Sequence, residues 1–285
     1  MFSINPRRRT LLLILLLSGP FTRLGAQTDT RPLIFGFLPS RTAVSLFKQY
    51  TPLLEYLSQQ LKRHVVLETA ADYPAFLLNT KNRKYDFVLT APHFALLAID
   101  SSKYNAPVTY TKALMADILV PRNSPITHIR QLASKMISLP AEGAIISMAG
   151  KHHMSQHGLT GSMSPQYVVT QSHNASLLAM LAGDTTAAIV SANITRQFMK
   201  QNTPIKKLAT TEVLPGMAFL VARDLPKQLR VSFTRTLIQM HDKRDGKVVL
   251  KKMGYPGYRK AMANEFEAAR PYLNMYNGSS NTSRD

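Results

Sequence analysis

A cluster of histidines is the first group whose spacing suggests chemistry: His152, His153 and His157. On a helix, His153 and His157 lie one turn apart, so both imidazoles could reach one metal ion, with His93 or His173 as a third ligand. The alternative is a polar helix end, where cationic side chains complement the helix dipole and Gly158 stops the helix. We favour the helix end and predict no metal site.

The motifs of common catalytic sites do not occur in the chain. There is no Gly-x-Ser-x-Gly elbow, no Gly-x-x-x-x-Gly-Lys phosphate loop and no His-Glu-x-x-His. The sequence has no cysteine, which excludes disulfides, thiolate metal sites, iron–sulfur clusters and cysteine nucleophiles. We therefore predict no enzyme and no cofactor. An exported α/β enzyme stays an alternative, because a catalytic triad is spatial rather than sequential.

Polar and aromatic side chains follow several of the predicted strands. At the carboxyl ends of strands in an open α/β sheet, such groups line the mouth of a ligand cleft. Taken singly, each is more often a core or capping residue, and only their coincidence at successive strand ends favours a site. The candidates are Ser40, Tyr73, Thr90, His93, Phe94, His173, Asn174, Ser191 and Asn193.

A further candidate is the segment Glu142-Gly143-Ala144, which precedes a predicted helix. The first amides of a helix lack intrahelical acceptors and attract an anion. Alternatively, the Glu142 carboxylate caps those amides itself and repels an anionic ligand. Both interpretations stay open.

Predicted strands and helices alternate along most of the chain. Leu46, Tyr50, Leu53 and Leu57 follow a helical period, whereas 33–38 is a continuous apolar strand. Such alternation predicts an α/β fold with mostly parallel sheets flanked by helices. The other strands are expected at 65–69, 87–90, 116–120, 136–139, 167–169, 187–190 and 217–221. The other helices are expected at 72–78, 92–99, 126–133, 143–157, 174–181, 194–200 and from 226 onward.

The first residues have the layout of a secretory signal peptide. Arg7, Arg8 and Arg9 precede an apolar run over 11–17, and a small residue, Ala26, ends the segment. The apolar run is too short to span a bilayer, so an uncleaved anchor is the less favoured alternative. We therefore predict a signal peptide over 1–26, a periplasmic protein, and contact with the membrane only through a partner.

The chain is strongly basic, with a net charge of +19. Such a chain favours anionic ligands or surfaces. Nucleic acid is not predicted as a partner, because the protein is exported and its basic residues are scattered rather than interleaved with aromatic side chains.

Five segments in order resemble the phosphonate-type periplasmic solute-binding proteins of ABC transporters. They contain "FGFLPSRTAV", "ETAADYPAF", "SPITHIRQLASK", "VTQSHNASLL" and "LPGMAFLVARDL". They lie within 35–61, 68–98, 124–143, 169–195 and 214–240. The resemblance implies the two-lobed type II periplasmic-binding-protein fold, with a small-molecule ligand in the cleft between the lobes and an ABC transporter permease or a membrane sensor as partner.

The same resemblance implies a domain division. The first lobe would comprise 27–115 and return over 213–276, the second lobe would comprise 116–212, and a flexible tail would follow over 277–285. The two segments crossing between the lobes would lie near 112–119 and 208–218.

Two site residues match family motifs. Tyr73 matches the ligand-contacting tyrosine of an Asp-Tyr motif, and His173 matches the histidine of a Ser-His-Asp motif in which Asn174 here replaces the acid.

Other positions depart from the family. The family has a hydroxyl-rich Ser-Thr-Ser-Gly phosphonate cradle at the place where this chain has Glu142, Gly143 and Ala144. The family also has a tyrosine in a Gly-Pro-x-Ser-Tyr motif, and this tyrosine is missing after Pro92. Ser191 or Asn193 stands where an acid is common; both belong to the candidate ligand site. We therefore expect an anionic or polar ligand other than a simple phosphonate. A protein that binds partners through a decayed cleft is the alternative.

Overall fold

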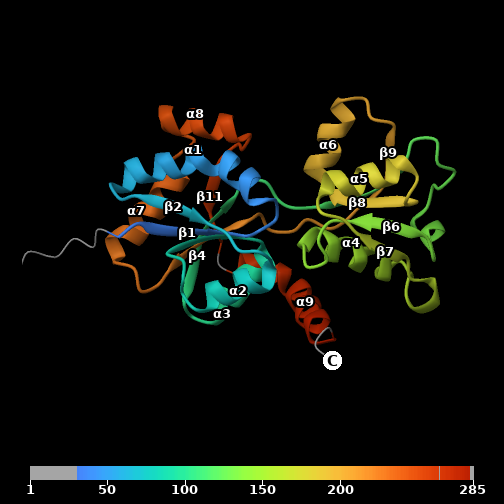
Figure 1. The fold of residues 1–285 in the computed structure, drawn as a ribbon, viewed down its shortest axis with the longest axis horizontal. Coiled ribbons are helices and arrows are strands. Elements are labelled where there is room, and N and C mark those ends of the chain that lie inside the picture. Colours follow the sequence, from blue (N-terminus) through green and yellow to red (C-terminus); the bar gives the residue numbers. More distant parts are fainter. Residues whose placement is uncertain (1–30, 263, 283–285) are drawn as a thin grey trace, which may run out of the picture. The chain divides into compact units, whose positions relative to one another are not determined.

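The computed structural model describes residues 31–262 and 264–282, and residues from Arg31 onward form one compact unit (Figure 1). The predicted signal peptide falls in residues 1–30, outside the described residues. In the described part of the chain, no helix combines the length and the apolar character that crossing a membrane requires.

The first sheet has the strand order β11-β4-β10-β3-β1-β2. Strand β1 is parallel to both of its neighbours, whereas β10 is antiparallel to β3 and β4. The strands are β1 (Leu33–Phe37), β2 (Val65–Glu68), β3 (Phe87–Thr90), β4 (Tyr104–Tyr110), β10 (Ala218–Ala222) and β11 (Tyr258–Lys260). We call this sheet and its helices the first lobe.

Helices cover both faces of the first sheet. On one face lie α1 (Ala43–Leu61), α7 (Lys227–Ile238) and α8 (Arg244–Met253), and on the other lie α2 (Tyr73–Lys81), α3 (Pro92–Asp100) and the 3-10 helix η3 (Glu265–Ala269) (Figure 1). Helix α1 buries the apolar stripe that its sequence predicts. Phe87 and Phe233 stack with ring centroids 3.8 Å apart, so aromatic rings fill the core between β3 and α7.

The second sheet has the order β7-β6-β8-β5-β9. Its strands are β5 (Ala116–Pro121), β6 (Met136–Leu139), β7 (Gln166–Val169), β8 (Ala187–Ser191) and β9 (Ile205–Thr210). Helix α4 (Ile145–Gln156) covers one face, and α5 (His173–Ala182) and α6 (Ala192–Lys200) cover the other (Figure 1). The 3-10 helices η1 (Ile129–Leu132) and η2 (Gly161–Met163) connect these elements. We call this sheet and its helices the second lobe.

Two short segments, 111–115 and 211–217, connect the sheets. They are tied to each other by an antiparallel bridge, in which the amides of Leu114 and Leu214 each donate to the other residue's carbonyl oxygen at 2.9 and 2.8 Å. The chain thus runs from the first sheet into the second and back as two adjacent strands.

The predicted α/β fold with two lobes is confirmed, but the sheets are mixed rather than mostly parallel. The reason is the return path: β10 enters the first sheet, and β5 enters the second, from a crossing segment, so each runs against its parallel neighbours. The helix expected at 126–133 is only the single 3-10 turn η1.

Three strands were not predicted: β4, β9 and β11. Strand β4 contains Pro107, which argues against a strand, but the register between β10 and β4 shifts beside it and accommodates the missing donor. Strand β9 contains Lys206 and Lys207, which an edge strand tolerates. Strand β11 has only three residues.

The C-terminal helix α9 (Arg270–Thr282) runs into the segment that the sequence indicates as a flexible tail. It packs against α3 of the first lobe and α4 of the second lobe. Helix α9 is therefore in contact with both lobes.

Candidate functional site

A group of rings lies where α2 and α3 begin and α9 passes. Tyr73 and Phe94 meet edge to face with ring centroids 5.5 Å apart, and Phe94 and Tyr276 do so at 4.8 Å. The His93 ring lies 3.8 Å from that of Phe94. We call Tyr73, His93, Phe94 and Tyr276 the aromatic cluster. Three of these residues, Tyr73, His93 and Phe94, were predicted from their positions after the carboxyl ends of strands.

The aromatic cluster contacts the residue that leads into α4 of the second lobe. The His93 Nε2 atom lies 3.3 Å from the Gly143 carbonyl oxygen. A methyl group on Gly143 would lie 2.8 Å from Tyr276 Cε2 and 3.0 Å from Tyr73 Cδ2. Only glycine therefore fits beside these rings without displacing them.

The first turn of α4 is not capped by a side chain. Its N-cap residue is Ala144, and the Glu142 carboxylate is exposed and pairs instead with the Lys151 ammonium at 2.7 Å. The capping interpretation of Glu142 is therefore wrong, since the lysine two turns along the helix takes up the carboxylate.

Backbone donors remain at this helix start. Among the described residues, the amides of Ile145, Ile146 and Ser147 have no hydrogen-bond acceptor. The Ser147 hydroxyl is itself engaged, because it donates to the Pro140 carbonyl oxygen at 3.0 Å. The turn therefore offers backbone N–H groups and no hydroxyl.

His93 is a neutral imidazole. Burial lowers its pKa to about 3. As the Nε2–H tautomer it can donate to the Gly143 carbonyl, which leaves Nδ1 as an acceptor. The Nδ1 atom and the buried Thr90 hydroxyl have no hydrogen-bond partner in the described chain. Two unsatisfied polar atoms thus lie between the end of β3 and the start of α3.

The second lobe contributes His173, the first residue of α5. Ser191 N–H donates to His173 Nδ1 at 3.3 Å. Burial, with a smaller effect of the Arg41 charge, lowers the His173 pKa to about 4, so this imidazole is also neutral near neutral pH. The starts of α5 and α6 are joined through this contact.

Arg41 was not singled out as a site residue. It follows the Pro39-Ser40 end of β1, is exposed, and forms no ion pair or hydrogen bond with the described residues. Its position in a strand-end loop was the available signal. Tyr276 was also missed, because it precedes an Asn- and Ser-rich segment expected to be a tail.

Several predicted residues do not join the aromatic cluster. Ser40, Asn174 and Asn193 are exposed, and the Asn193 side chain accepts from Arg196 on its own helix. None of them has a hydrogen bond to the cluster.

The histidines of α4 form no larger ligand set. The His153 and His157 rings are 4.4 Å apart, and His157 Nδ1 lies 2.8 Å from the His153 carbonyl oxygen. Within the described residues, no group of three or more His, Cys, Asp or Glu side chains could hold a metal ion.

Two α/β lobes joined by paired crossing strands, with helix starts meeting between them, define the class of two-lobed substrate-binding proteins. The family of ABC transporter phosphonate periplasmic substrate-binding proteins matches residues 35–266. The chain belongs to this family, as its motifs predicted. Proteins of this family bind small ligands for an ABC transporter permease and are periplasmic; they are transport components rather than enzymes.

Solved structures share the fold. PhnD1 from Prochlorococcus marinus in complex with methylphosphonate has a TM-score of 0.76 at 14% identity, covering 87% of this chain and 99% of that one. XAC2383 from Xanthomonas citri bound to ATP has a TM-score of 0.74 at 14% identity, covering 87% and 98%. The phosphonate transporter component PA3383 from Pseudomonas aeruginosa has a TM-score of 0.73 at 14% identity, covering 87% of both chains. At this identity the likeness concerns the fold.

Proposed function

We propose that this protein captures a small ligand between its lobes for an ABC transporter permease, and that the ligand is larger, less charged or more aromatic than a simple phosphonate. One observation carries this proposal: the first turn of α4 offers backbone amides without hydroxyls and is faced by the aromatic cluster.

The loss of hydroxyls matters because a buried dianion needs several donors at once. A charge left partly unpaired in a dry site is costly. The imidazoles of His93 and His173 add no positive charge near neutral pH, because burial holds the pKa of the first at about 3 and that of the second at about 4.

The remaining groups suit a ligand with one negative charge and an apolar body. The α4 amides that have no acceptor among the described residues bind a single anionic group. The Arg41 guanidinium, which has no partner in the described chain, adds long-range attraction. The rings of Tyr73 and Phe94 offer edge and face contacts to an aromatic or aliphatic body.

Calorimetry with two ligand sets tests the proposal. The first set consists of methylphosphonate, 2-aminoethylphosphonate, phosphite and phosphate. The second set consists of monoanionic aromatic carboxylates such as benzoate and phenylacetate. We expect measurable binding only in the second set. Micromolar or tighter binding of any member of the first set would contradict the proposal.

Replacing Arg41 tests its role. Arg41→Gln should lower the affinity for an anionic ligand severalfold. The free energy of unfolding should not change, because the side chain has no partner in the described structure. Arg130→Gln, at an exposed arginine in η1, is the matched control and should leave the affinity unchanged.

We also propose that the exported form begins at Gln27, and that the lobe boundaries at 115 and 212 separate the moving parts. Mass spectrometry of the periplasmic fraction should show the Gln27 terminus; a chain that keeps Met1 in the membrane fraction would overturn the processing proposal.

A further inference from the structure

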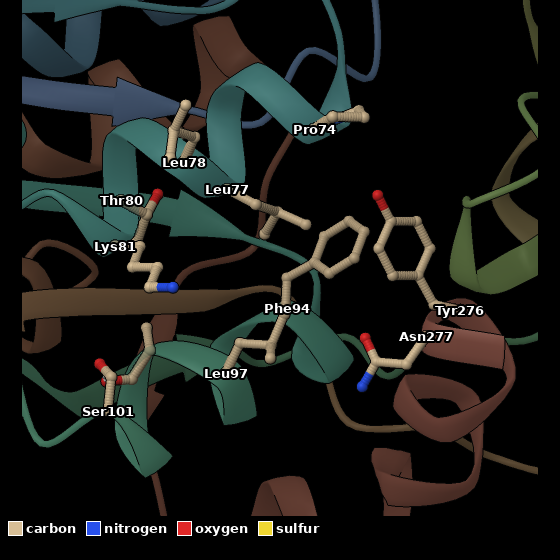
Figure 2. A pocket seen from close by; sticks show the side chains of 11 residues that line it. Pro74, Leu77, Leu78, Thr80, Lys81, Phe94, Leu97, Ser101, Tyr276 and Asn277 are labelled. Carbon is tan, nitrogen blue, oxygen red and sulfur yellow. Dashed lines mark hydrogen bonds between the residues drawn. The ribbon is translucent and has the colours of Figure 1, made fainter. Parts of the chain in front are cut away.

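A cavity of about 750 Å³ opens in the first lobe between α2, α3 and α9 (Figure 2). It shares the rings of Phe94 and Tyr276 with the aromatic cluster, but its other walls come from α2 and α3. The cavity is not lined by the first turn of α4, by Arg41 or by His173. It therefore adjoins the ligand site proposed above at the rings of Phe94 and Tyr276 and extends away from it along α2 and α3.

Most of the cavity wall is apolar. Leu77, Leu78 and Leu97 line it together with Phe94 and Ala98. Leu78 is 57% exposed, so this part of the cavity wall is open to water. A ligand with a hydrocarbon part would remove this surface from water.

The cavity also contains one charged lining residue, Lys81, and no acidic one. Figure 2 shows the Lys81 ammonium extending from the end of α2 toward the interior. It forms no hydrogen bond or ion pair with the described residues. The Lys103 ammonium donates to the Lys81 carbonyl oxygen at 2.6 Å and adds a second positive charge at the same end of α2.

From this arrangement we propose that the cavity binds a single-chain amphiphile with an anionic head group, such as a medium-chain carboxylate. The head group pairs with Lys81, and the hydrocarbon chain lies along Leu77, Leu78 and Leu97 toward Phe94. An amphiphile matches the combination of an apolar wall and one ammonium without a partner among the described residues, whereas a small hydrophilic anion would leave the wall exposed to water.

Calorimetry with the purified protein tests the ligand class. Decanoate should bind at least tenfold more tightly than hexanoate, since each buried methylene strengthens binding by about fourfold. Decanoate should also bind more tightly than decan-1-ol and decylammonium, which have the same chain without the negative charge. Equal binding of the three, no dependence on chain length, or no binding of decanoate would each overturn the proposal.

Variants with matched controls locate the site. Lys81→Gln should lower the affinity for decanoate severalfold. Lys200→Gln is the control and should leave the affinity unchanged, because Lys200 ends α6 as Lys81 ends α2. Leu78→Glu should lower the affinity for decanoate by tenfold or more. Leu178→Glu should leave it unchanged; Leu178 lies in α5 and is 56% exposed. Because both leucines are exposed, the variants should fold, which circular dichroism checks.

Neither pair of substitutions changes a residue of the interlobe site. A decanoate affinity that responds equally to the control variants would assign the binding to another place and overturn the proposal. Loss of binding in the α2 variants, with aromatic carboxylates unaffected, would support it whatever the interlobe ligand is.

Discussion

Helices α4 and α5 follow neighbouring parallel strands of the second sheet, yet they begin differently. At α5 the Ser172 hydroxyl accepts from the Ala175 amide at 3.1 Å, so part of the helix start is satisfied by its own sequence. At α4 the N-cap is Ala144 and the nearby Glu142 carboxylate binds elsewhere.

The difference separates a structural helix start from one that can bind a ligand. Each start also has a neutral imidazole beside it: His93 contacts Gly143 before α4, and His173 begins α5. A capped start stabilises the fold by itself, whereas an uncapped start keeps its donors for another partner.

Acidification should have the largest effect. The pKa of His93 is about 3 in the folded protein, against about 6.5 in an unfolded chain. Below pH 6.5 the unfolded state therefore binds a proton that the folded state does not. The free energy of unfolding should fall by up to about 1.4 kcal/mol per pH unit from this group, or about 3 kcal/mol between pH 6.5 and 4.

Urea unfolding at several pH values measures this dependence. His93→Gln should flatten it more than His173→Gln, because His93 is fully buried and His173 is only partly buried. His64→Gln, at an exposed histidine, is the control. The same pH dependence in His93→Gln and in the unsubstituted protein would contradict the buried neutral imidazole.

Gly143→Ala should destabilise the protein by about 2 kcal/mol, because the added methyl group overlaps Tyr276 and Tyr73. Thermal unfolding measures the loss. Gly278→Ala in α9 is the matched control: its methyl group meets nothing within 4 Å, so stability should stay the same or rise slightly. Equal effects of the two substitutions would show that the rings do not press on the start of α4.

Ser172→Ala should cost about 1 kcal/mol of unfolding free energy through loss of the α5 cap. Ser191→Ala is a close control, since Ser191 is the N-cap residue of α6 but its side chain makes no capping hydrogen bond. Urea unfolding should separate the two serines, and a larger loss at Ser191 would contradict the assignment.

Ala144→Asp should make α4 resemble α5, with the smallest change in stability: a gain of about 0.5 kcal/mol from capping. The same carboxylate should abolish binding of an anionic ligand, because it occupies the free amides. Ala144→Asn caps without adding charge and should weaken the ligand less. Unchanged anion affinity in Ala144→Asp would show that α4 does not bind the ligand.

The sequence predicted the continuous apolar strands better than the strands that contain proline or lysine. Strands β1, β3 and β8 are mostly apolar runs, and their approximate bounds followed from that pattern. Strands β4 and β9 contain proline and lysines that only their sheet positions explain. The local pattern does not show whether a strand lies at the edge of a sheet, as β9 does, or carries a register shift, as β4 does.

For the site, the strand-end rule predicted Tyr73, His93 and Phe94, whose rings meet. It could not predict Tyr276, because that residue reaches the cluster from a helix at the far end of the chain. It also could not decide the partner of Glu142, since the choice between an amide and Lys151 depends on side-chain direction rather than spacing.

The strand order of the first sheet has a consequence for folding during synthesis. Strand β4 lies between β10 and β11, and both are made more than a hundred residues after it. All strands of the second sheet are synthesised in that interval. The second sheet can therefore complete its hydrogen bonds while β4 still has no partner strand. Formation of the first lobe must therefore wait for the last quarter of the chain, and a chain truncated before Ala218 should hold one folded lobe and one open sheet edge.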